Sequence, residues 1–161
     1  MKALKINKVL IALDLDQTAK KVAETGCSLA QSVGAEIVLL QIISDPVYQS
    51  LKEHVTITGF AGFKAKVPLK LDSIDELKIV AQHFLDSLKR HLGIAAIQTL
   101  VKEGDAAESI LKIAKSLHAD IIVIGSHSLK EPGNEDSGKV AEKVLDQTSI
   151  PLFIVPVKQK K

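Results

Sequence analysis

The strongest constraint on the fold is an alternation of short apolar runs with longer segments of helical period. The apolar runs occupy residues 8–13, 36–43, 94–101, 120–124 and 151–157. Continuous apolar runs of this length are typical of strands buried on both faces of a parallel sheet. Between them, apolar residues recur at steps of three and four, which indicates amphipathic helices. The pattern therefore predicts an α/β fold with helices on both faces of the sheet.

The expected sheet is open, five-stranded and parallel, with strand order 3-2-1-4-5. Gln98 and Thr99 interrupt the third run, which predicts that this strand lies at an edge. Capping residues and glycines mark the ends of the helices: Gly34 closes the first, Ser73 with Glu76 opens the second, Gly93 ends it, and Asp105 with Glu108 opens the third. A fourth helix is expected over 138–147.

We interpret residues 1–161 as one domain, a length that allows an independent core. Residues 44–70 lack a sustained period and contain two prolines and two glycines. We expect this segment to be an irregular insertion or flap beside the ligand-binding crevice that such sheets form at the carboxyl ends of their strands.

Composition excludes several classes of function. Aromatic residues make up 3% of the chain and the net charge is +2, so no nucleic-acid partner is expected. No apolar run reaches the roughly 18 residues of a membrane span. Asp14 and Asp16 interrupt the N-terminal apolar stretch, so we expect no secretion signal and a cytoplasmic location.

Cysteine and histidine do not suggest a reactive or metal site. Cys27 is the single cysteine, which excludes an intrachain disulfide, and it falls in a helical pattern without a basic neighbour in sequence. His83, His91 and His118 lack metal-ligand spacing, so no structural metal is expected.

The best candidate for a binding site lies where two of the predicted strands end. In open α/β sheets, ligands bind beyond the carboxyl ends of the strands, where the winding reverses. Asp14 follows the first strand and Gly125 ends the fourth. A carboxylate there can accept hydrogen bonds from a sugar, while a glycine lets backbone N–H groups approach phosphate. The alternative is that Asp14 or Asp16 only caps the first helix.

The loop after the fourth strand contains a misleading match. Residues 133–140 read GNEDSGKV, the beginning of a Walker A motif, but Val140 stands where Ser or Thr would hold magnesium. The match also begins eight residues after the strand instead of directly after it. We reject this motif.

The chain resembles the universal stress proteins over nearly its whole length. The resemblance rests on VLIALD, GAEIVLLQII, ADIIVIGSH and GKVAEKVLDQTSIPLFIVP. ATP-binding members of that family carry G-x2-G-x9-G-[S/T], and this spacing falls on Gly125, Ser128, Gly138 and Lys139. Ser128 replaces the second glycine, and Lys139 replaces the hydroxyl residue. Glu131 and two further acids occupy the same loop.

The resemblance implies a Rossmann-like fold of the adenine-nucleotide-hydrolase type and a site for ATP or another adenine nucleotide. The base and ribose residues that it implies are Ala12, Asp14, Ile42 and Ile124. The phosphate residues that it implies are Gly125, His127, Ser128, Gly138 and Lys139. Because the motif departs at two positions, we expect weak binding. Catalysis beyond slow ATP hydrolysis is not implied, because the sequence supplies no positioned general base.

Two other interpretations remain open from the sequence. The same fold could serve as a protein-interaction module with an empty crevice. A phosphorylated receiver domain is a poorer match, because its third strand should be apolar and end in an acceptor Asp. The final strand should leave one edge unpaired, and a two-fold homodimer through Leu152, Ile154 and Val155 is expected. The alternative is a monomer in which Pro151 and Pro156 keep this edge from pairing.

Overall fold

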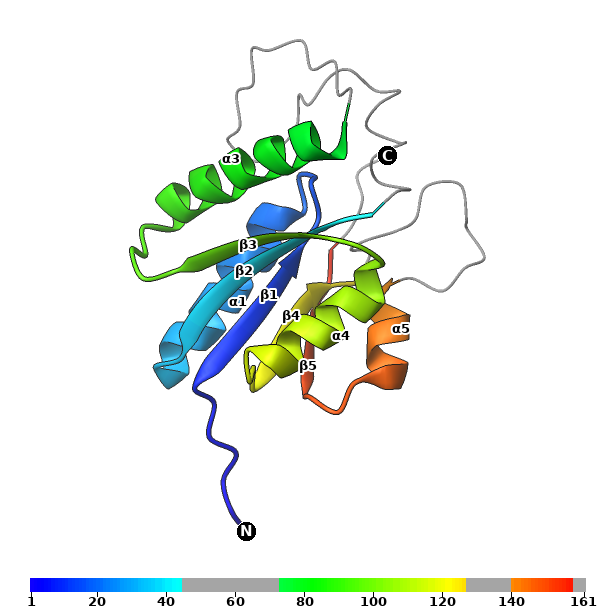
Figure 1. The fold of residues 1–161 in the computed structure, drawn as a ribbon. Coiled ribbons are helices and arrows are strands. Elements are labelled where there is room, and N and C mark those ends of the chain that lie inside the picture. Colours follow the sequence, from blue (N-terminus) through cyan, green and yellow to red (C-terminus); the bar gives the residue numbers. More distant parts are fainter. Residues whose placement is uncertain (45–72, 127–139, 158–161) are drawn as a thin grey trace.

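The computed structural model describes residues 1–44, 73–126 and 140–157. Strands and helices alternate along the chain (Figure 1). The elements are β1 (Lys8–Leu13), α1 (Ala19–Val33), β2 (Glu36–Ile43), α3 (Ile74–Leu92), β3 (Gln98–Glu103), α4 (Ala106–Ser116), β4 (Ile121–Gly125), α5 (Val140–Gln147) and β5 (Leu152–Val155).

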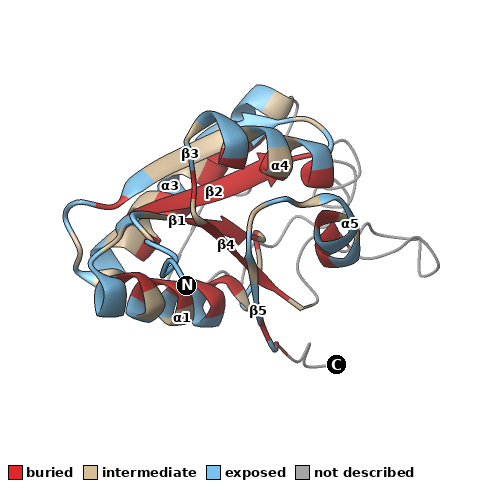
Figure 2. Ribbon diagram, turned by 90° about the horizontal axis from the view of Figure 1, so that it is seen from below, coloured by how far each residue is buried: buried red, intermediate tan, exposed pale blue. Residues whose placement is uncertain are grey.

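The five strands form one parallel sheet in the order β3-β2-β1-β4-β5, which confirms the predicted topology. β1 is central and pairs with β2 on one side and with β4 on the other. Figure 2 shows these central strands as buried, whereas β3 at the edge is coloured as partly exposed. The edge position expected for the third strand is therefore confirmed.

The sheet separates two apolar clusters, because successive side chains on a strand point to opposite faces. Val9 and Ile11 of β1 belong to the cluster under α1 and α3. Leu10 and Ala12 belong to the cluster under α4 and α5. Burying each large aliphatic side chain stabilises the fold by about 1.5–3 kcal/mol relative to exposure. This two-sided burial explains why the strands lack polar alternation in sequence.

The predicted helix caps are confirmed. The backbone N–H of Glu76 donates to Ser73 Oγ at 3.2 Å, and that of Glu108 donates to Asp105 Oδ2 at 3.0 Å. Gly34 and Gly93 end α1 and α3 with φ of 69° and 67°, a left-handed conformation that glycine adopts without strain.

Two strands are shorter than the apolar runs that predicted them. In the run 94–101, residues 94–97 form a turn instead of a strand, and the N–H of Ile97 donates to the carbonyl of Ile94 at 3.3 Å. Ile97 is nevertheless buried, so its apolar character reflects packing against the core rather than strand pairing. In the run 151–157, Pro151 and Pro156 flank the observed strand, and neither can donate a backbone hydrogen bond.

One polar side chain is enclosed in this core. Gln41 of β2 is 1% exposed, and its Oε1 has no hydrogen-bond partner in the described part of the chain. Its register partners are Leu13 of β1 and Val101 of β3. An unsatisfied buried acceptor costs about 1–3 kcal/mol, so we expect Gln41 to lower the stability of the fold.

Candidate functional site

The candidate site lies at the carboxyl edge of the sheet, between the ends of β1 and β4. Ala12 pairs with Ile124 across these two strands. β2 follows β1 on one side, whereas β4 lies on the other, so the winding of the sheet reverses here. Asp14 follows β1 and Gly125 ends β4. The topology thus brings together two segments more than a hundred residues apart in sequence.

Three of the predicted base and ribose residues share one face of the sheet. Ala12, Ile42 and Ile124 belong to the cluster under α4 and α5 and are 1%, 2% and 0% exposed. Their side chains are enclosed by the protein, so they belong to the core beneath this edge and not to its surface. A bound molecule would reach their backbone groups rather than their side chains.

Asp16 has a local structural role before α1. Asp16 Oδ1 accepts hydrogen bonds from the backbone N–H of Thr18 at 2.8 Å and from the Thr18 hydroxyl. Its carbonyl accepts from the N–H of Ala19 at 3.2 Å, so Asp16 organises the turn that leads into α1. The N-terminal capping residue of α1 is Thr18. The alternative that Asp14 or Asp16 caps the first helix is therefore wrong: Asp16 orders the turn before Thr18, and half-buried Asp14 lies two residues nearer to β1.

The end of β4 is fixed by backbone and side-chain bonds to the C-terminal segment. Gly125 is buried and is paired with Val155 of β5. The next residue, Ser126, donates its N–H to the carbonyl of Val155 at 2.9 Å. Its hydroxyl accepts from the N–H of Val157 at 3.1 Å.

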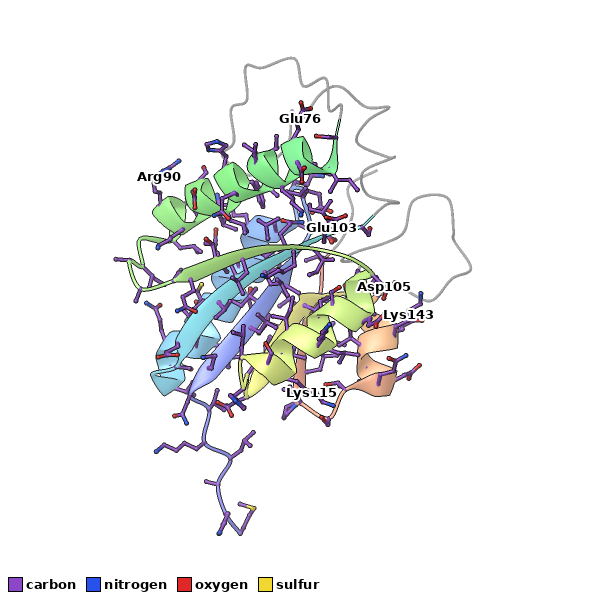
Figure 3. All side chains as sticks on the ribbon, in the orientation of Figure 1. Glu76, Arg90, Glu103, Asp105, Lys115 and Lys143 are labelled. Atoms are coloured by element: carbon purple, nitrogen blue, oxygen red, sulfur yellow. The ribbon has the colours of Figure 1, made fainter. Side chains whose placement is uncertain are left out.

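Further carboxylates lie at the end of β3 and the start of α4, where Figure 3 labels Glu103 and Asp105. Lys78 Nζ of α3 lies 2.9 Å from Glu103 Oε2, and this hydrogen bond raises the pKa of Lys78 above its ordinary value. Asp105 is engaged as the cap of α4. Both carboxylates therefore have structural partners, which reduces their repulsion of a bound anion.

Four predicted phosphate residues cannot be placed. His127, Ser128, Gly138 and Lys139 lie outside the described residues, as does nearly all of the predicted flap over 44–70. No group of three or more His, Cys, Asp or Glu side chains suited to a metal occurs in the described ranges.

Cys27 is 3% exposed in α1, and burial raises the pKa of its thiol to about 11. The thiolate is the reactive form of cysteine, so this environment disfavours nucleophilic chemistry. Among the described helices, none is long and apolar enough to cross a membrane.

The outer strand β5 exposes apolar side chains. Ile154 and Phe153 are each 39% exposed, and Leu152 is partly buried. Val155 is 2% exposed and packs in the core of its own chain. Of the three residues predicted for an interface, Ile154 is thus the most exposed to solvent. Its neighbour Phe153 is equally exposed.

Sequence reasoning missed Ser126 and Phe153. Ser126 has a weak sequence signal, a hydroxyl residue directly after a strand that ends at the crevice, but its partner lies 31 residues away. Phe153 lies within an apolar run, in which the sequence does not distinguish exposed from buried positions.

The described geometry defines the class: a doubly wound parallel α/β domain in which the ends of β1 and β4 lie side by side at the point where the winding reverses. The model of the universal stress protein family matches residues 5–156. The chain belongs to this family.

Individual relatives are similar over nearly the full length. Universal stress protein Sll1388 of Synechocystis sp. is 27% identical over 152 residues, covering 92% of this chain and 96% of the relative. Universal stress protein YxiE of Bacillus subtilis is 26% identical over 152 residues, covering 92% and 98%. The solved structure of MJ0577, a universal stress protein of Methanocaldococcus jannaschii, is 22% identical with a TM-score of 0.69, covering 97% of this chain and 99% of that one.

Proposed function

We propose that this chain is a cytoplasmic stress-response protein that binds an adenine nucleotide weakly and performs no catalysis beyond slow ATP hydrolysis. The observation that carries the proposal is the meeting of Asp14 and Gly125 at the switch point of the sheet. This is the position at which open α/β sheets bind their ligands.

Two structural relatives support the choice of ligand class. A universal stress protein solved in complex with cAMP has a TM-score of 0.63 at 13% identity, covering 96% of this chain and 99% of that one. The universal stress protein of Archaeoglobus fulgidus in complex with dAMP has a TM-score of 0.57 at 18% identity, covering 93% and 98%. Both ligands contain adenine, a sugar and one phosphate, which favours an adenine nucleotide here.

In this proposal the roles follow the chemistry of the groups. Asp14 accepts hydrogen bonds from ribose hydroxyls, and the backbone at Ile42 and Ile124 borders the base. The backbone N–H groups after Gly125 approach the phosphates. From the family spacing, His127, Ser128, Gly138 and Lys139 complete the phosphate contacts.

The test is a calorimetric titration of ATP into Asp14→Asn, with Asp105→Asn as the matched control. Both changes remove one negative charge at the same edge of the sheet, and Asn caps helices about as well as Asp. Hydrogen bonds to a charged group contribute about 1.5–3 kcal/mol, so Asp14→Asn should weaken ATP binding roughly tenfold or more. The control should leave it unchanged.

Equal affinities of the two variants and the wild type would refute the role of Asp14. Absence of ATP binding in all three proteins would favour the alternative, an interaction module that uses the same fold.

We also propose a homodimer through β5. This strand is the outer one, so one of its edges has no partner within the described sheet, and Phe153 and Ile154 expose apolar surface beside it. Pairing with a second copy about a two-fold axis would satisfy the edge and cover both side chains.

Light scattering should give twice the 17.3 kDa of one chain. Ile154→Lys should dissociate the dimer, because its half-exposed side chain would be enclosed by the partner. Ile79→Lys, at a 60% exposed position on α3, is the matched control and should not. A wild-type mass near that of one chain would contradict the proposal.

A further inference from the structure

A single hydroxyl joins the end of β4 to the segment that follows β5. Ser126 Oγ accepts from the N–H of Val157 at 3.1 Å and donates to the carbonyl of the same residue at 3.4 Å. Pro156, which lies between β5 and Val157, has no N–H and cannot continue the strand pairing. Beyond Pro156, hydrogen bonds of the Ser126 hydroxyl therefore replace the backbone pairing between β4 and β5.

The segment that Ser126 holds is also fixed from two other directions. The side chain of Val157 is 4% exposed and packs in the cluster under α1 and α3. Lys21 Nζ of α1 donates to the carbonyl of Pro156 at 2.9 Å. The position of this segment is thus set jointly by β4, α1 and the core.

The contact between Ser126 and Val157 lies at the carboxyl edge of the sheet, where the nucleotide is proposed to bind. β1, β4 and β5 are parallel, so their carboxyl ends meet at the same edge of the sheet. Ser126 is adjacent to Gly125, and β5 is the outer strand. A displacement of β5 would reach Gly125 through its pairing with Val155, and a displacement of the segment after β5 would reach it through the hydroxyl of Ser126.

We propose that Ser126 is a positioning residue of the nucleotide site, through which the state of the outer strand β5 sets nucleotide affinity. This inference rests on the proposed function. Ser126 itself need not contact the ligand, because its hydroxyl is engaged with Val157.

The chain contains a matched control at the opposite end of β5. Thr148 Oγ1 donates to the carbonyl of Ile150 at 2.7 Å and accepts from the N–H of Ile150 at 2.9 Å. The same pair of hydroxyl–backbone bonds therefore precedes β5 at the edge remote from the site. Thr148→Val and Ser126→Ala each remove one such pair.

The experiment compares ATP affinity by calorimetry in the wild type, Ser126→Ala, Ser126→Thr and Thr148→Val. Thermal unfolding of each variant, measured in parallel, gives the stability lost with the hydroxyl. Loss of one net hydrogen bond corresponds to roughly a three- to tenfold change in an equilibrium constant. We expect ATP binding to weaken by that factor in Ser126→Ala, to be retained in Ser126→Thr, and to be unchanged in Thr148→Val.

Equal ATP affinity of Ser126→Ala and Thr148→Val would overturn this inference while leaving the nucleotide site intact. Failure of the wild type to bind ATP would overturn both the inference and the proposed function.

Discussion

Replacing Gly26 by alanine tests how tightly α1 packs on the sheet. A Cβ at this position would lie 2.6 Å from Ile11 Cδ1, 2.9 Å from Ile11 Cγ1 and 3.2 Å from Val123 Cγ1. Both neighbours are 0% exposed, so they have little room to retreat. Alanine gains about 0.5–1 kcal/mol over glycine inside a helix, whereas overpacking a core costs about 1–3 kcal/mol. We expect Gly26→Ala to lower the free energy of unfolding by about 1–2 kcal/mol.

A double mutant separates the clash from other causes. Ile11→Val removes the atom nearest to the new Cβ and alone costs about 0.5–1.5 kcal/mol. In the double variant the shortest contact, to Ile11 Cδ1, is removed while the contact to Cγ1 stays. The combined loss should therefore be smaller than the sum of the single losses by about 0.5–1 kcal/mol, within the range for contacting residues. The chain has no tryptophan, so urea unfolding is best followed by far-ultraviolet circular dichroism.

Gly34→Ala is the control for this cycle. Gly34 has φ of 69° and nothing within 4 Å of an added Cβ, so its cost is backbone strain alone. Ile11→Val should not relieve that strain. Additive losses in Gly26→Ala with Ile11→Val, or stabilisation by Gly26→Ala alone, would refute the packing argument.

Two further changes have defined outcomes. Gln41→Leu removes the unsatisfied buried oxygen and should raise the free energy of unfolding by about 1 kcal/mol, whereas a loss in urea unfolding would show that Gln41 is satisfied. Because the pKa of the Cys27 thiol is raised from 9.0 to about 11, the folded state holds its proton more firmly than the unfolded state. The stability contributed by the protonated thiol is full below pH 9 and is lost as pH rises through 11. Between these pH values the wild type should therefore lose more free energy of unfolding than Cys27→Ala, measured by urea unfolding at each pH. Thiol labelling at neutral pH should proceed only at the rate of unfolding.

The fold could be predicted from the sequence where burial is two-sided. β1 and β2 have the predicted bounds, because a strand enclosed on both faces leaves an unbroken apolar run. The predicted start of the third strand at residue 94 was wrong, because apolar residues such as Ile97 can pack in the core from a turn as well as from a strand. Apolar character alone does not distinguish these two cases.

The candidate site was predictable to the extent that it depends on topology. Asp14 and Gly125 could be paired once the strand order was assumed, since parallel strands end at one edge. That Asp16 orders the turn before α1 depends on hydrogen bonds that sequence does not reveal. The contact between Ser126 and Val157 depends on where the C-terminal segment lies after β5, which no local pattern predicts.

The proposed nucleotide site is tested most directly by a calorimetric titration of ATP into the wild type and into the double variant Ser128→Gly with Lys139→Ser. The double change restores the residues that ATP-binding relatives carry at these two motif positions. We expect the wild type to bind ATP with a dissociation constant in the tens of micromolar or weaker, and the double variant to bind more tightly. Submicromolar binding by the wild type, or a double variant that binds no better, would contradict a weakened adenine-nucleotide site.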